Sequence, residues 1–555
     1  MSTKFKQISK TIGLLTLFPL LFGCTGGPKK VRILERADRY FKAGEYDKAK
    51  LEYLSVIRLD NRDVTAFRQL GIIWLDGGAP FRAVPFLRRA VELAPQDVVA
   101  RLKLGVAFQS VGASTEGRNQ AIAVLEKDPA NADAIVLAAD ASKTKDEIAN
   151  TEKRFQEFPQ KQTAAFHLAS ASLAMSRSDV GAAADEVQQA LTIDPNSARA
   201  HQVRAYLYLF RKDPAHAEAE LKTAAESSPA RSEARVKYAE FQAANGQTEE
   251  AKKSLNAITK EAPDFIPAWR DLAQIALIEK KYDDAVAMLD NVFSRDSDNP
   301  EARILQADLL VAKGESAAAV AILDKLNTAY PDRPLIKYAL GRAYVATDNA
   351  GQASAAFEQA IALNPDYPEA ILALSNLNLR AGKPQPVASA MEDLLKKHSD
   401  VSEARVLLAR AYEASGRADK AASILGDQLK STPQSAEAYF NLGVALRADK
   451  KTDEARQAFE KSTALAPDDF RPVNQLVEID LADKRYDAAS ARVQQELTKH
   501  PNAAASHVLE AKIYIAHGDQ QDWSRAEAAL QKAIQLDNNF VVAYQLLVGD
   551  DEIIV

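Results

Sequence analysis

The feature that most constrains the fold of this chain is a period of 34 residues that recurs along most of its length. Between Pro334 and Tyr367 the period is marked by Leu340, Gly341, Tyr344, Ala353, Phe357, Ala360 and Pro365. Residues of the same kinds fill the same slots between Leu70 and Pro95, and again between Leu442 and Pro467. A fixed period of this length indicates stacked supersecondary units that bury their apolar faces on their neighbours, and not one globular core.

The spacing and the residue types resemble those of the tetratricopeptide repeat family over residues 30–555. The resemblance implies an all-α fold, a right-handed superhelical solenoid of about 14–15 helix-turn-helix repeats. Small residues such as Gly341 and Ala353 would let the two helices approach closely. Pro365 would follow the end of the second helix, because proline cannot continue a helix. The short turn between the helices often carries Gly or Asp, as at Gly314.

A chain of 555 residues exceeds what one hydrophobic core usually supports, whereas a repeat array has no such limit. We expect an N-terminal repeat block at 30–131 and a degenerate repeat or kink at 132–161. A C-terminal superhelix follows at 162–555, and its last repeat is incomplete. The apolar end, which includes Ile553, Ile554 and Val555, predicts either a longer protein or a chain end that docks on a partner.

Residues 1–23 have the pattern of a signal peptide. Lys4, Lys6 and Lys10 precede the mostly apolar stretch 11–22, which is too short to span a bilayer as a helix. The stretch ends in Leu21-Phe22-Gly23-Cys24, and Cys24 is the only cysteine of the chain. This sequence resembles the lipobox of bacterial lipoproteins, in which the preceding peptide is removed and the cysteine is lipidated. The alternative is an inert cysteine after a plain apolar N-terminus.

The lipoprotein resemblance implies that residues 24–29 are the lipidated Cys24 and a short tether. Several acyl chains on one residue give stable anchoring, so the lipid anchor would be the contact with the membrane. Thr25 stands where an Asp would retain an enteric-type lipoprotein in the inner membrane. We therefore expect a location in the bacterial cell envelope, on the periplasmic face of the outer membrane rather than at the inner membrane.

The charge of the chain excludes two classes of partner. The formal net charge is −6, and it becomes more negative when the three lysines of residues 1–23 are removed. Nonspecific nucleic-acid binding needs a basic footprint, and so does a polybasic membrane patch. We therefore predict no nucleic-acid partner.

The sequence carries no motif of a known catalytic or metal site. It lacks a Gly-rich phosphate loop, a His-Glu-x-x-His pair, a Cys-x-x-Cys pair and a Gly-x-Ser-x-Gly elbow. The seven histidines do not have the spacing of metal ligands and are typical of surface or packing positions. We therefore predict a protein that is not an enzyme and that needs no cofactor and no metal.

Binding is the function that remains. In the tetratricopeptide repeat family, positions 2, 5, 9 and 12 of the first helix line a concave groove. Their mixed charges and apolar character suit a peptide or a helix laid in the groove, although they are also consistent with plain solvation of that face. The groove candidates on this mapping are Arg68, Tyr206, Glu240, Arg270, Asp308, Tyr338, Arg342, Asn376, Arg410 and Phe440.

The sequence thus predicts a non-enzymatic protein-interaction scaffold, lipid-anchored in the envelope, that organises an assembly or export complex. It resembles the long repeat lipoproteins of exopolysaccharide export and of exosortase-linked (PEP-CTERM) protein sorting. One alternative is a groove that binds polysaccharide directly through Tyr206, Tyr338 and Phe440. Another is a noncatalytic repeat part of a larger enzyme.

Overall fold

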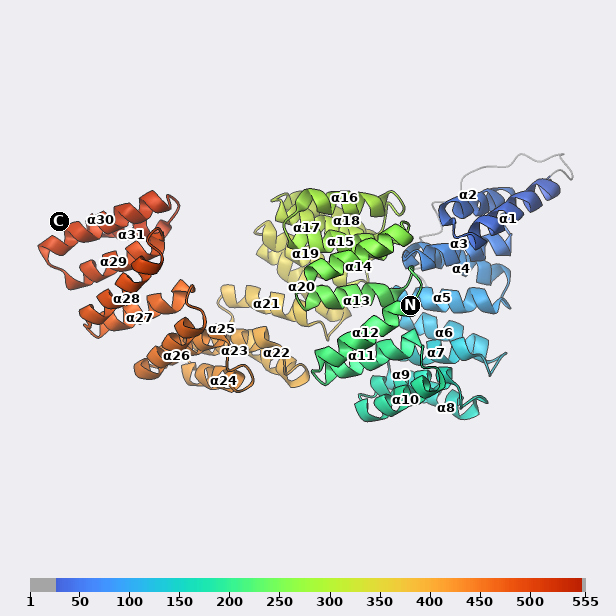
Figure 1. Ribbon diagram of the computed structural model, residues 1–555, viewed down its shortest axis with the longest axis horizontal. Coiled ribbons are helices and arrows are strands. Elements are labelled where there is room, and N and C mark those ends of the chain that lie inside the picture. The colour runs from blue at the N-terminus through green and yellow to red at the C-terminus, as the bar shows by residue number, and fades with distance from the viewer. Residues whose placement is uncertain (1–25, 552–555) are drawn as a thin grey trace. The chain divides into compact units, whose positions relative to one another are not determined.

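The computed structural model describes residues 26–551, in which the chain forms 31 α-helices and no β-strand. The prediction of an all-α solenoid of helix-turn-helix repeats is confirmed. The predicted signal peptide, the predicted lipidation site Cys24 and the apolar residues Ile553–Val555 lie outside the described residues. Figure 1 shows α1 to α30 as successive antiparallel pairs, in which each odd-numbered helix is the first of its pair, and α31 follows the last pair.

The chain divides into two compact units, and each is described by itself. Unit 1 comprises residues 1–322 and unit 2 comprises residues 323–555. The helices of unit 1 are α1 (Gly26–Lys42), α2 (Tyr46–Leu59), α3 (Val64–Asp76), α4 (Pro80–Leu93), α5 (Val98–Ser110), α6 (Ser114–Leu125), α7 (Ala132–Asp140), α8 (Lys145–Glu157), α9 (Ala164–Ser176), α10 (Val180–Ile193), α11 (Ala198–Phe210), α12 (Pro214–Glu226), α13 (Glu233–Ala244), α14 (Thr248–Glu261), α15 (Ile266–Ile278), α16 (Tyr282–Phe293) and α17 (Pro300–Ala312).

The boundary between the units falls inside α18 (Ser316–Ala329). The helices of unit 2 are α19 (Pro334–Ala346), α20 (Ala350–Leu363), α21 (Pro368–Arg380), α22 (Pro384–Lys397), α23 (Ser402–Ala414), α24 (Ala418–Ser431), α25 (Ala436–Ala448), α26 (Thr452–Leu465), α27 (Phe470–Ala482), α28 (Tyr486–Lys499), α29 (Ala504–His517), α30 (Gln520–Leu536) and α31 (Val541–Asp551). α30 is longer than the second helix of the preceding pairs, where the sequence has extra residues near Asp519.

The first helix of many repeats begins at a side chain that caps it. The carboxylate of Asp63 accepts a hydrogen bond from the backbone N–H of Ala66 at 2.9 Å, ahead of α3. Asp97 caps α5 and Asn299 caps α17 in the same way, three residues before the bonded amide. Such a cap satisfies one of the amides that a helix start leaves without an intrahelical partner, so the repeat boundary is fixed locally.

In every pair except α7 and α8, the turn between the two helices contains one residue with a positive φ. Gly314 takes this place with a φ of 83°, as the sequence predicts. Six repeats instead place a residue other than glycine there, and the sequence pattern identifies none of these positions: Ser178, Lys212, Lys280, Asp348, Lys450 and Lys484. A side chain in this conformation costs roughly 1–2 kcal/mol, which the packing of the two helices offsets.

The small residue in the eighth slot lies against a large residue of the second helix. A Cβ added at Gly341 would stand 2.4 Å from the ring of Phe357, which is 1% exposed. The same replacement at Gly71 would stand 2.4 Å from Leu87. The predicted close approach of the paired helices is therefore present, and it is the reason that glycine occupies this slot.

Residues 132–161 form the shortened pair α7 and α8. A capping box fixes the start of α8, because Thr144 and Glu147 each accept a hydrogen bond from the other's backbone N–H. Burial raises the pKa of Glu147, but bonds from the backbone of Thr144 and Lys143 and from the Thr115 hydroxyl outweigh it and lower the pKa to about 2. A core cluster joins Leu137 and Phe155 to Leu173 of α9, so the pair packs into unit 1. That residues 132–161 divide two blocks stays a prediction.

Among residues 26–551, none of the helices has the length and the apolar character needed to cross a membrane.

Candidate functional site

Unit 1 has a pocket of about 450 Å³ that crosses four successive first helices, α7, α9, α11 and α13. We call it the unit 1 pocket. Its lining residues come from these helices and from the turn after α7: Asp140, Lys143, Ser172, Met175, Ser176, Arg199, Gln202, Val203, Tyr206 and Glu233.

One face of α11 supplies four of these side chains. Arg199, Gln202, Val203 and Tyr206 are three or four residues apart, so they project from the same side of the helix. Ser172, Met175 and Ser176 do the same on α9. The opposite faces pack on the second helices, with Leu168 and Leu207 in one core cluster with Val187. The pocket is therefore built by the repeat itself, which turns the unpacked face of each first helix the same way.

The acidic end of the unit 1 pocket is already paired. Asp140 accepts a hydrogen bond from the Ser172 hydroxyl at 2.6 Å and forms an ion pair with Arg199. The Asp140 side chain is 12% exposed and the Arg199 side chain is 49% exposed. This pair links α7 to α11 across α9, and it leaves the outer part of the guanidinium open to a ligand.

Two uncharged polar groups of the unit 1 pocket have no hydrogen-bond partner among the described residues, namely the Gln202 amide and the Tyr206 hydroxyl. Tyr206 is 44% exposed. Burial of the rest of its ring raises its pKa, so the hydroxyl keeps its proton at neutral pH and can donate a hydrogen bond. An amide and a phenol that are free to donate and accept suit the backbone of a bound peptide.

Charged groups continue from the unit 1 pocket along α13 and α15. Lys237 donates to the carboxylate of Glu240 at 2.8 Å. Arg270 donates to Oδ1 of Asp271 at 3.1 Å, whereas Oδ2 is buried with no partner in the described chain. Burial raises the pKa of Asp271 to about 6, with a smaller contribution from Glu240 and against the lowering effect of Arg270. Of the predicted groove residues, Tyr206, Glu240 and Arg270 thus lie on neighbouring first helices.

The other two candidates in unit 1 lie apart from this group. Arg68 on α3 forms an ion pair with Asp97 at 2.7 Å, which joins its repeat to the next one. Asp308 on α17 is half-buried. The structure does not bring either into the unit 1 pocket.

In unit 2, two predicted aromatic platforms are packing residues. The Tyr338 ring lies 5.8 Å from the Phe357 ring and 5.3 Å from the Tyr367 ring, and the Arg342 guanidinium stands 5.8 Å from it. The Phe440 ring lies 5.9 Å from Phe459.

The Arg471 guanidinium stands over the Phe440 ring, 4.7 Å from its centre. Asn376 donates to the carbonyl of Leu372 at 3.2 Å, four residues earlier on α21, and Arg410 on α23 is exposed. A binding role for the ten candidates stays a prediction.

A second pocket, of about 340 Å³, lies in unit 2 between α20, α21 and α22 and is lined by residues that include Ile361, Leu374 and Leu394. Both second helices and the first helix α21 line it, and none of the predicted groove residues does.

Sequence reasoning missed several residues of the unit 1 pocket. Arg199 and Glu233 stand in the second position of their repeats, so the groove mapping could have identified them. Asp140 and Lys143 lie in the degenerate stretch, where the 34-residue register cannot be followed. No local signal shows that Asp140 meets Arg199, because the two are 59 residues apart.

One cluster of possible metal ligands occurs in the described chain, at the turn between α29 and α30. It consists of His517, Asp519 and Asp522, whose ligand atoms lie within 4.8 Å of one another. Each acidic group already has a partner. Asp519 accepts from the backbone amides at the start of α30, and Asp522 binds His517 at 2.5 Å and Arg525 at 3.0 Å. Arg525 already supplies the positive charge that a metal ion would bring to Asp522. We therefore interpret the cluster as a set of contacts that hold the turn between α29 and α30.

Comparison with protein-family models identifies the family of the repeat. Three models, each described as a tetratricopeptide repeat, match the chain. One matches residues 211–275, 276–343 and 379–444, the second 436–469, and the third 34–98 and 338–385. Together they cover more than half of the sequence. This chain is a tetratricopeptide repeat protein. The residues that the three models match include most of the stretch in which the 34-residue period is regular, and they lie in both units.

Comparison with curated protein sequences finds no match. Among solved structures, the tetratricopeptide repeat chain is similar to the APC/C hetero-tetramer Cut9–Hcn1, with 14% identity and a TM-score of 0.42 over 94% of this chain and 96% of that one. It is similar to yeast Tom70, with 16% identity and a TM-score of 0.40 over 80% of this chain and 99% of that one. It is also similar to Naa15/Naa10 bound to HypK-THB, with 12% identity and a TM-score of 0.38 over 95% of this chain and 97% of that one.

Proposed function

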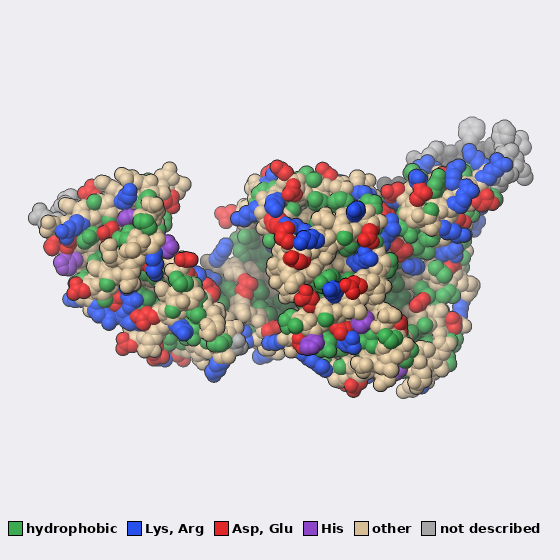
Figure 2. Space-filling model, in the orientation of Figure 1, with side chains coloured by type: hydrophobic (Ala, Val, Ile, Leu, Met, Phe, Trp, Pro, Cys, Tyr) green, Lys and Arg blue, Asp and Glu red, His purple; other side chains and the backbone are tan. Residues whose placement is uncertain are grey.

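We propose that this tetratricopeptide repeat protein is a non-enzymatic scaffold that holds a protein or peptide segment on its first-helix face. The observation that supports this most directly is the unit 1 pocket, in which Gln202 and Tyr206 face an open volume without partners in the described chain. Repeat arrays of this kind use such extended faces for binding. Figure 2 shows acidic and basic side chains interspersed over the visible surface, which suits a mixed-charge segment better than a polyanion.

Protein is the favoured ligand class over polysaccharide. Sugar binding would use open aromatic platforms, and the sequence offers Tyr206, Tyr338 and Phe440 for this role. Tyr338 and Phe440 pack against neighbouring rings, which leaves Tyr206 as the open one of the three.

The proposed location is the periplasmic face of a bacterial outer membrane, with Cys24 as the lipid-bearing residue and an envelope assembly or export complex as the partner. Exopolysaccharide secretion and protein sorting are the two systems that the sequence resemblance favours. The lipobox-like run that ends at Cys24 supports this proposal. To test it, membranes from cells with the wild-type chain and with Cys24→Ala are fractionated. The alanine variant should leave the outer membrane fraction, and its retention there would exclude the anchor.

The binding proposal is tested by affinity co-purification from detergent-solubilised envelopes with mild crosslinking and mass spectrometry. The variant is Gln202→Ala with Tyr206→Ala. The matched control is Phe210→Ala, since Phe210 is a 68% exposed aromatic on the same helix that does not line the pocket. A partner of the unit 1 pocket is lost from the double variant and kept by the control. Recovery of the same proteins with both variants would contradict the proposal, and carbohydrate in the eluate without a protein would favour polysaccharide.

A further inference from the structure

Two segments of unit 1 that are far apart in the sequence meet at one place. The turn before α4 carries Gly77, whose carbonyl accepts a hydrogen bond from the backbone N–H of Ile266 at 3.1 Å. On α4, Arg82 donates from Nε to Asp296 at 2.7 Å and from Nη2 to Asp298 at 2.8 Å, across 214 and 216 residues. Figure 1 shows the α3 and α4 pair beside the ends of α14 and α15. The second pair of helices is thus joined to the eighth and ninth.

The meeting point is closely packed as well as hydrogen-bonded. Ala79 is 1% exposed and belongs to the core cluster of Ile266 and Leu289. Gly78 has a φ of 79°, and a Cβ added there would stand 2.3 Å from the ring of Pro267. Further along the same edge, the Arg231 guanidinium lies 4.5 Å from the Tyr46 ring. Such a fit between distant repeats is not supplied by the stacking of neighbours.

We propose that these residues form a reversible clasp that holds unit 1 as a closed turn, and that the clasp opens while the repeats themselves stay folded. The clasp is defined as residues 77–82 on one side and 264–267 with 296–298 on the other. It is a conformational device of the fold and does not depend on which partner the scaffold binds.

The energetics separate the clasp from the rest of unit 1. In a repeat array each pair is stabilised chiefly by its own helices and by its nearest neighbours, so parting the second pair from the eighth breaks none of those interfaces. Arg82 is the key residue, because Asp296 is 2% exposed and its other side-chain bond comes from the amide of Asn299. A buried carboxylate without its cation is strongly disfavoured, whereas the bond to Asp298, which is 71% exposed, contributes little.

The amide of Ile266 reports the state of the clasp. Ile266 is the first residue of α15, so its N–H has no acceptor within the helix and is protected by Gly77 of the other side. Residue-resolved hydrogen exchange is measured on the full chain, for the wild type, for Arg82→Ala and for a control. The control is Arg89→Ala, an arginine of the same helix and of similar exposure that pairs only with Glu92 of its own helix among the described residues.

We expect exchange at Ile266 to rise roughly tenfold or more in Arg82→Ala, the range of a lost charged hydrogen bond, and to stay unchanged in Arg89→Ala. The amides inside α3 and α15 should keep their protection in both variants. Unchanged exchange at Ile266 in Arg82→Ala would overturn the proposal. Loss of protection throughout α3 and α15 would overturn it too, because the contact would then be part of a core that cannot open separately.

A pair of glycine variants tests the clasp without touching a charge. Gly78→Ala brings a methyl group against Pro267, whereas Gly246→Ala has the same φ of 79° and nothing within 4 Å of the new atom. Both variants carry the same backbone strain, so the difference between them isolates the contact across the clasp. Exchange at Ile266 should rise in Gly78→Ala alone, together with an increase in the radius of gyration by small-angle scattering. An equal response in the two variants would overturn the proposal.

Discussion

Glycines inside the helices have two different roles, and they predict opposite effects of a methyl group. At Gly341 a Cβ would stand 2.4 Å from the ring of Phe357, which is almost fully buried. At Gly426, inside α24, an added Cβ meets nothing within 4 Å. The first glycine is required by packing, whereas the second only adds conformational freedom to the unfolded chain.

We predict that Gly341→Ala lowers the free energy of unfolding of unit 2 by roughly 1–3 kcal/mol, since the ring of Phe357 must move from its place. Gly426→Ala should raise it by about 0.5–1 kcal/mol, the usual gain of Ala over Gly within a helix. Urea unfolding followed by circular dichroism measures both changes. A stabilising effect of Gly341→Ala would contradict the close approach of α19 and α20.

Asp271 is a buried acid with incomplete pairing. Its side chain is 16% exposed and only Oδ1 receives hydrogen bonds, both from Arg270. Burial raises its pKa from 3.8 to about 6, Arg270 lowers it by less, and Glu240 adds to the rise. The folded protein therefore holds this proton at pH values at which the unfolded chain has lost it.

The raised pKa of Asp271 makes the stability of unit 1 depend on pH. Between about pH 4 and pH 6 the folded state binds more protons at Asp271, so its contribution to the stability of unit 1 falls as the pH rises. A shift of about two pH units corresponds to about 3 kcal/mol at most. Asp271→Asn should remove this fall and stabilise unit 1 at pH 7. The difference between the unfolding free energies of wild type and variant, measured from pH 4 to pH 7, checks this; a difference that does not vary with pH would refute it.

At the scale of helices, one buried carboxylate ties three elements of unit 2 together. Asp480 on α27 is fully buried. It binds Arg456 of α26, Arg485 at 3.2 Å just before α28, and Arg492 of α28 at 2.9 Å. Arg456 is itself 13% exposed. Removing the acid would leave the largely buried Arg456 with only the more exposed Asp483 as its partner, at 2.9 Å, and this loss costs more than an exposed ion pair contributes.

We expect Asp480→Ala to destabilise unit 2 by about 3–5 kcal/mol, the cost of breaking a buried ion network. The control is Asp427→Ala, because Asp427 is 64% exposed and pairs with Lys430 on its own helix. It should change stability by less than about 1 kcal/mol. The free energies of both variants come from urea unfolding. Equal effects of the two substitutions would show that the network of α26, α27 and α28 adds nothing beyond a surface pair.

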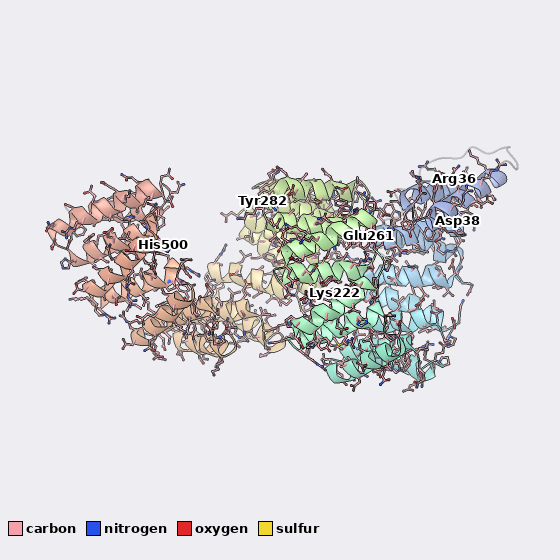
Figure 3. The ribbon with its side chains drawn as sticks, in the orientation of Figure 1. Arg36, Asp38, Lys222, Glu261, Tyr282 and His500 are labelled. Atoms are coloured by element: carbon pink, nitrogen blue, oxygen red, sulfur yellow. The ribbon has the colours of Figure 1, made fainter. Side chains whose placement is uncertain are left out.

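At the scale of the whole chain, coupling between repeats decides how far a perturbation spreads. The helices that pack extensively are the two of a pair and the successive pairs, as in α19, α20 and α21. Figure 3 labels Arg36 and Asp38, two residues of α1. Their partners are in the adjoining helix, Glu52 for Arg36 and Tyr53 for Asp38. Stability is then a sum over neighbours rather than a property of one core.

This predicts that substitutions act locally. In hydrogen-exchange mass spectrometry, Gly341→Ala should speed exchange in α19 to α21 and leave the helices from α3 to α6 unchanged. Asp271→Asn should alter unit 1 in the same restricted way. A uniform loss of protection over all helices would mean that the chain unfolds in a single step, contrary to the nearest-neighbour picture.

The sequence predicted the helices well and the pocket only in part. The 34-residue period set the helix starts, because caps such as Asp63 and close contacts such as Gly341 with Phe357 act within one repeat. It did not identify the turns in which four lysines take a positive φ, because residue preference alone assigns that conformation to glycine. It identified Tyr206 as a groove residue but did not distinguish this open ring from the packed rings of Tyr338 and Phe440, because they occupy the same kind of slot.

What the sequence alone determined is thus the repeat: two antiparallel helices, their boundaries and the face that each first helix leaves unpacked. Only the tertiary structure decided the features that need repeats far apart in the chain. These are the meeting of Asp140 with Arg199 and the contact of Arg82 with Asp296. The physical reason is that a period encodes contacts between neighbours, whereas the path of the stacked repeats is the sum of many small rotations that no single repeat specifies.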